Sequence, residues 1–84
     1  MTAPELDDAA TALSRASEDL GRASRAVADA CEVLEAVIGT ATQPEAHRTL
    51  MRAQARALGA AVAFGEAAKA HATAQAHTPE TWGR

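Results

Sequence analysis

The sequence predicts an all-α fold: an antiparallel two-helix hairpin that pairs with a second copy into a four-helix bundle. Ala is the best helix former and a poor strand former, and it supplies 24 of the 84 residues. Apolar residues recur every seven positions in both halves, as in a coiled coil. Gly39 to Pro44 is the single internal break, and a short connection between two long helices makes them antiparallel.

The first helix is expected over about residues 3–38. Thr2 and Glu5 form a capping-box pattern with Pro4 in the first turn, and Gly39 supplies a helix stop. Large residues at heptad spacing form one ridge, flanked by rows of small residues that begin at Ala9 and Ala10. The predicted core of the hairpin consists of Leu6, Leu13, Leu20, Val27, Leu34 and Ile38.

A turn at 39–43 and a second helix over about 44–77 complete the hairpin domain, residues 1–78, and a tail follows at 79–84. Thr42, Pro44 and Glu45 repeat the capping pattern, and Pro79 stops the helix. The second helix has four adjacent apolar rows, starting at positions 46, 47, 50 and 51, so its apolar arc is wide enough for more than one neighbour. The predicted partner interface consists of Leu50, Met51, Leu58, Val62, Phe64 and Trp82.

The charge balance of the halves differs, and the predicted hairpin register places opposite charges together across it. Arg52 falls beside Asp29, and Glu66 beside Arg15. Gly21 falls among small residues of the second helix, which predicts close backbone approach there.

The predicted core is thin, because few residues are larger than Ala. At about 25 cal/mol per Å² of buried apolar surface against about 1.5 kcal/mol of ordering entropy per residue, a chain this small has nearly zero stability alone. Self-association, or binding to a partner, would bury more apolar surface and supply the missing stability. The expected function is therefore a non-enzymatic protein–protein interaction or assembly module, whose partner is a second copy or another helical protein.

Reactive and ligand-binding groups are sparse. His71 and His77 lack the HxxxH or ExxH spacing of helical metal sites, so no metal or cofactor is predicted, although a histidine-centred metal site is an alternative. The serines have no His or strained elbow nearby, which argues against nucleophilic catalysis. Cys31 is expected to be a buried thiol, the alternative being a disulfide between subunits.

Arg48, Arg52 and Arg56 form a stripe at i, i+4 and i+8 that offers candidate phosphate contacts. A small nucleic-acid-binding or regulatory protein is therefore an alternative function. The stripe has no interleaved aromatic residues, and acidic residues of the first helix are within its expected reach. The net charge is −3, so nucleic acid is not the expected partner.

The sequence predicts a cytoplasmic protein without a membrane span. The acidic start, MTAPELDD, lacks the basic and apolar regions of a secretory signal peptide. No uncharged run approaches the ~20 residues of a spanning helix. Trp82 in the tail is interpreted either as a cap on the end of the bundle or as a short partner-binding peptide.

In length and architecture the chain is similar to the small WxG-motif hairpins and the PE-protein hairpins exported by type VII secretion systems. That resemblance implies a secreted helical hairpin as a further alternative. The chain departs from the pattern: the turn reads Gly39-Thr40-Ala41-Thr42, the Trp-Gly pair lies at Trp82-Gly83, and the Tyr of the export signature is absent. Membership of either family is not predicted.

Overall fold

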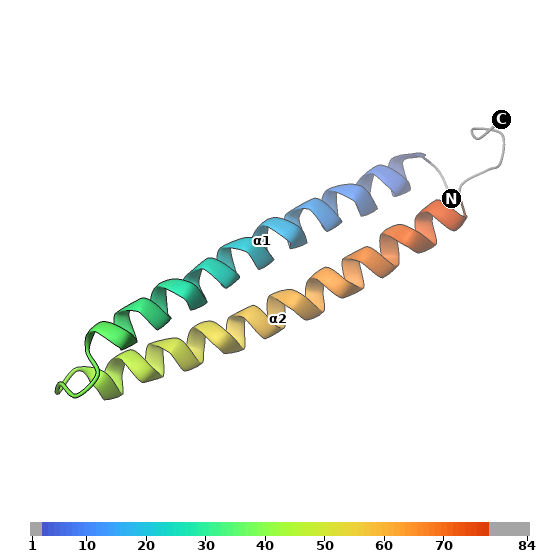
Figure 1. Ribbon diagram of the computed structural model, residues 1–84. Coiled ribbons are helices and arrows are strands. Elements are labelled where there is room, and N and C mark those ends of the chain that lie inside the picture. Colours follow the sequence, from blue (N-terminus) through green and yellow to red (C-terminus); the bar gives the residue numbers. More distant parts are fainter. Residues whose placement is uncertain (1–2, 78–84) are drawn as a thin grey trace.

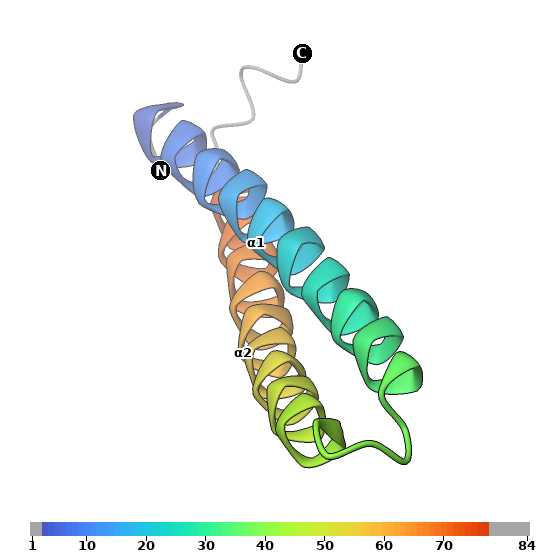
Figure 2. The same cartoon turned by 90° about the vertical axis from the view of Figure 1, so that its left-hand side faces the viewer.

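The computed structural model describes residues 3–77, and these form two long helices joined by a short turn (Figure 1). Helix α1 spans Ala3–Ala36 and helix α2 spans Gln43–Ala76, 34 residues each. They run antiparallel and pack against each other along their length, which a second view confirms (Figure 2). The predicted all-α hairpin is confirmed, with helix boundaries within two residues of those expected from the sequence.

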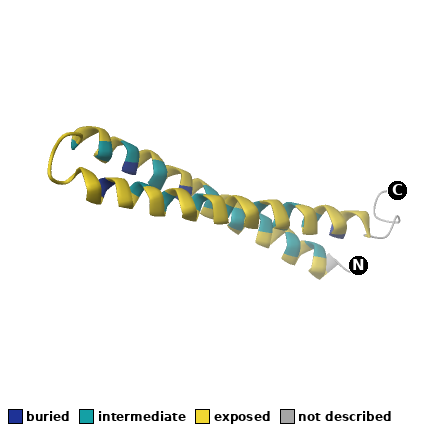
Figure 3. Ribbon diagram, turned by 90° about the horizontal axis from the view of Figure 1, so that it is seen from below, coloured by how far each residue is buried: buried dark blue, intermediate teal, exposed yellow. Residues whose placement is uncertain are grey.

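The two helices meet along a narrow contact, which we call the seam. Its buried residues are all alanines, with Ala23 4% exposed, Ala30 6%, Ala46 5% and Ala74 2%. Figure 3 shows the buried and half-buried residues between the helices and exposed residues elsewhere. The half-buried seam residues from α1 are Leu6, Ala9, Leu13, Ala16, Leu20, Val27, Leu34 and, in the turn, Val37, and those from α2 are Leu50, Ala53, Ala57, Ala60, Phe64, Ala67 and His71.

The seam corrects two expectations about large residues. Ile38 was expected in the core but is 63% exposed, because α1 ends at Ala36 and half-buried Val37 takes the last seam position. Leu50 and Phe64 were assigned to a partner interface, but both lie half-buried in the seam. The heptad positions of α2 that begin at Leu50 pack against α1 together with those that begin at Ala46. The positions that begin at Met51 do not.

The turn is held by its own hydrogen bonds. Gly39 has a positive φ of 82°, and its N–H donates to Gln43 Oε1 at 2.8 Å. The Thr40 hydroxyl donates to the Val37 carbonyl oxygen at 2.6 Å. Thr42 has helical angles, φ −84° and ψ −11°, and makes no side-chain capping bond. The predicted capping box at Thr42 is therefore wrong, since a capping residue needs an extended backbone. Thr2 lies outside the described residues.

Replacing Gly39 by Ala is expected to destabilise the hairpin by about 1 kcal/mol, because a side chain disfavours the left-handed backbone. A Cβ there would meet nothing within 4 Å, so the cost is conformational alone. Gly59→Ala is the matched control: it lies within α2 with equally open surroundings, and it should stabilise by roughly 0.5–1 kcal/mol. Urea denaturation of both variants tests the opposite signs, and equal shifts would contradict the assignment.

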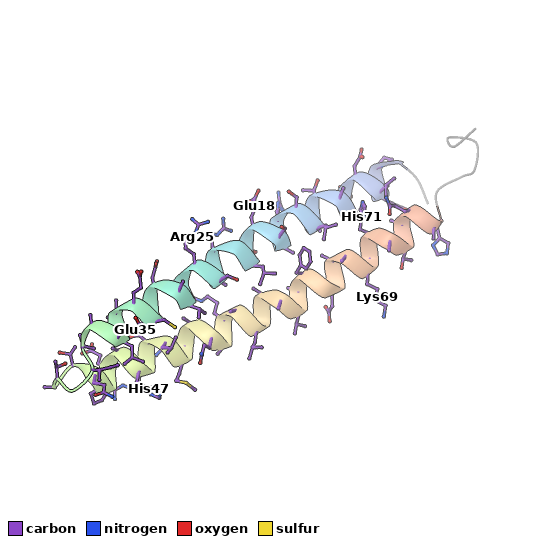
Figure 4. All side chains as sticks on the ribbon, viewed as in Figure 1. Glu18, Arg25, Glu35, His47, Lys69 and His71 are labelled. Carbon is purple, nitrogen blue, oxygen red and sulfur yellow. The ribbon has the colours of Figure 1, made fainter. Side chains whose placement is uncertain are left out.

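The charged side chains lie away from the seam. Glu18 and Arg25 point away from α2, and Lys69 points away from α1 (Figure 4). Among the described residues the ion pair that forms is Arg22 with Asp19, one turn apart on α1. The expected pairs of Arg52 with Asp29 and of Glu66 with Arg15 do not form, because these residues match in height along the hairpin but lie on its outer surfaces.

Candidate functional site

One long side of the hairpin has no charged residue, and we call it the uncharged face. On α1 it lies beside the heptad positions that begin at Leu6, and on α2 beside those that begin at Leu50. A groove lined by Val27, Gln54, Ala57 and Leu58 shows that these two surfaces are on the same side of the seam. Asp7 and Glu35 mark its two ends on α1, and His47 marks its turn end on α2. Its residues are Ala10, Ser14, Ser17, Gly21, Ser24, Ala28 and Cys31 on α1, and Met51, Gln54, Leu58, Ala61, Gly65, Ala68 and Ala72 on α2.

The α2 half of this face carries the large apolar side chains. Leu58 is 70% exposed and Met51 is 52% exposed, two helical turns apart. Val62, 62% exposed, lies at the outer edge of the face one turn beyond Leu58. The groove beside Leu58 has a volume of about 420 Å³. Three of the predicted interface residues therefore lie together on the surface, and we call them the α2 ridge.

The α1 half of the face is lined only by small residues, and we call it the α1 trough. It consists of Ala10, Ser14, Ser17, Gly21, Ser24, Ala28 and Cys31. At its centre, a Cβ on Gly21 would meet nothing within 4 Å. The close approach to α2 that was expected at Gly21 is therefore wrong, since Gly21 faces outward from the seam.

The opposite side of the hairpin is grooved but carries charges. A groove of about 480 Å³ near the turn is lined by Ala30, Val33 and Ala46 and also by the acidic residues Asp29 and Glu45. A second groove of about 390 Å³ follows it toward the middle of the hairpin, lined by the Asp19–Arg22 pair and Arg56 among others. Charged residues line both grooves on this side, whereas the groove on the uncharged face is lined by none.

The predicted phosphate contacts, Arg48, Arg52 and Arg56, are all exposed on α2. Their side chains make no hydrogen bond or ion pair with another residue of the described range 3–77. Arg56 nevertheless shares its groove with Asp19, and Glu45 lies one turn before Arg48. Acidic residues therefore lie close to the arginine stripe, whereas binding to a nucleic-acid backbone depends on a surface that is uniformly positive.

The histidines and the cysteine lie apart. His71 is half-buried in the seam, where Figure 4 shows it between the helices. His77 Nδ1 lies 2.8 Å from the Thr73 carbonyl oxygen. No group of three His, Cys, Asp or Glu side chains within residues 3–77 is placed to hold a metal ion. Cys31 is a half-buried free thiol at the turn end of the α1 trough. Trp82 lies outside the described residues.

Comparisons with family models, with curated proteins and with solved structures find no match to this chain. Neither described helix is long and apolar enough to cross a membrane. The candidate site therefore rests on the hairpin itself, and its most unusual feature is the uncharged face with an exposed ridge and a facing trough.

Proposed function

We propose that this protein is a non-enzymatic assembly module, a helical hairpin that self-associates into a dimeric four-helix bundle. The observation that carries the proposal is the exposure of Leu58 and Met51 on a face without charges. Burying a Leu or Met side chain is worth about 1.5–3 kcal/mol, and a contiguous exposed apolar face is typical of interaction surfaces. A second hairpin placed on this face would bury both residues twice.

The thin core of the hairpin supports the same proposal. Among the described residues the buried ones are all alanines, and no large side chain is fully buried. A monomer of this kind lacks the core that the second copy would supply.

Light scattering of the purified 84-residue chain across a micromolar dilution series tests the proposal. The expected mass is twice the 8.6 kDa of one chain, about 17 kDa. Far-UV circular dichroism of the same samples should lose helix content on dilution, because folding and association are then linked. A cooperatively folded monomer at these concentrations would contradict self-association and would leave another helical protein as the partner.

A further inference from the structure

Resting on the proposed self-association, we propose a specific pairing: two hairpins dock through their uncharged faces with their turns at the same end. In this arrangement the α2 ridge of each copy fits into the α1 trough of the other. Leu58 of each copy inserts over Gly21 and Ser24 of its partner, and Met51 over Ala28 and Cys31. Every contact occurs twice, as an isologous two-fold interface requires.

The size of the face fits a second copy of the same chain. The uncharged face runs between Asp7 and Glu35, about 40 Å along α1, and the hairpin is 15 Å across. The face therefore covers on the order of 600 Å², at the lower end of the roughly 600–1,000 Å² per partner of a standard interface. The absence of charge also matters, because a self-complementary interface opposes each residue with residues of an identical surface. A charged face would bury charges of one chain against those of its copy, which costs several kcal/mol.

The contrast between ridge and trough decides the orientation. Two-fold docking allows either each helix against its own copy, or α1 against the partner's α2. The first choice stacks ridge on ridge and leaves a gap between the two troughs. The second choice fills each trough with a ridge, at the packing density that interfaces and protein interiors share. The complementary sizes of the ridge and trough residues therefore favour packing of α1 of one copy against α2 of the other.

The heights of the residues along the hairpin agree with that choice. Val27 and Gln54 line one groove, so they lie within about one helical turn of the same height. Counting four residues along each antiparallel helix places Leu58 at about the height of residue 23, next to Gly21 and Ser24. When the turns lie at the same end, Leu58 therefore meets the trough where its side chains are smallest. Glycine is the residue that permits the closest approach of a partner to a helix backbone.

Gly21→Leu tests this pairing, with Gly59→Leu as the matched control. Both glycines lie within helices, and a Cβ on either meets nothing within 4 Å of the hairpin. Both changes raise helix propensity, so the hairpin itself should stay folded. Gly59 lies outside the uncharged face. We expect Gly21→Leu to raise the dimer dissociation constant about 10- to 100-fold, since overpacking acts at two equivalent contacts. Gly59→Leu should leave it within about threefold.

A size exchange supplies a second readout. Gly21→Leu combined with Leu58→Ala moves the large side chain from ridge to trough, and dimerisation should recover relative to Gly21→Leu alone. Sedimentation equilibrium of all four proteins measures these constants. If Gly21→Leu dimerises as well as or better than the wild type, helices face their own copies and the proposed pairing is overturned while self-association stands. If the wild type is monomeric, self-association itself is overturned, and the pairing with it.

Discussion

Replacing Leu58 by Glu is expected to convert the dimer to a monomer, with a rise of roughly 100-fold or more in the dissociation constant. Leu58 is 70% exposed in the hairpin, so the change removes little of the packing that folds the monomer. In the proposed dimer the same position is covered, and a carboxylate placed there would be buried without a partner at both symmetric sites. Leu and Glu have similar helix propensities, so the helix is preserved.

The control for this substitution is Ala63→Glu. Ala63 is an exposed residue of α2, but it borders the groove on the opposite side of the hairpin, with Arg22 and Arg56. The change adds the same charge to the same helix, so solubility and net charge are matched. Sedimentation equilibrium should give a wild-type constant for Ala63→Glu and a mass of one chain for Leu58→Glu. Equal association of the two variants would show that the uncharged face is not the interface.

The helices and their pairing could be predicted from the sequence because the signals are local and repeated. Leu6 and Ala9 each begin a row with a strict seven-residue period, and a regular period fixes which side of a helix is apolar without knowledge of its neighbour. Ala46 begins the matching row on α2, and its members lie in the seam as expected. The glycine at position 39 also signals the turn, since it adopts a conformation that other residues avoid.

The assignment of faces on α2 could not be derived in the same way. Its apolar arc spans four rows, so the pattern allows either the Leu50 row or the Met51 row to turn toward α1. The structure turns the Leu50 row inward, which places Phe64 in the seam and leaves Leu58 outside. When the apolar arc of a helix is broad, its sequence alone does not determine which part of the arc packs against the other helix of the hairpin. That choice depends on the shape of α1.

The ion pairs and the role of Gly21 were mispredicted for a related reason. Register along the hairpin gives the height of each residue, but a contact also needs both residues to point toward the same groove. Arg52 and Asp29 agree in height and are nevertheless on outer surfaces. Gly21 likewise lies at the expected height but beside the seam, facing the solvent side of the uncharged face. Facing direction is a property of the packed pair, and single-helix periodicity does not contain it.

The alanines of the seam should be the least tolerant positions of the hairpin. Ala23 is 4% exposed near the middle of α1, between the Leu20 and Val27 positions of the seam. Replacing Ala23 by Leu is expected to destabilise the protein by about 1–3 kcal/mol, the usual cost of overpacking. The larger side chain would have to push α2 away, and neighbouring alanines on both helices are too short to follow. Ala and Leu differ little in helix propensity, so the effect reports packing.

Ala12→Leu separates this packing effect from the added apolar area. Ala12 lies on the same helix but is exposed, so a leucine there has room and should shift stability by less than about 0.5 kcal/mol. Urea denaturation followed by circular dichroism, at one fixed protein concentration because association contributes to stability, compares the two variants. A Leu at position 23 that leaves stability unchanged or raises it would mean that the helices can separate without loss. In that case close contact between alanine rows would not be what holds the hairpin together. Both substitutions add the same atoms, so the expected difference in stability between Ala23→Leu and Ala12→Leu comes only from the burial of position 23.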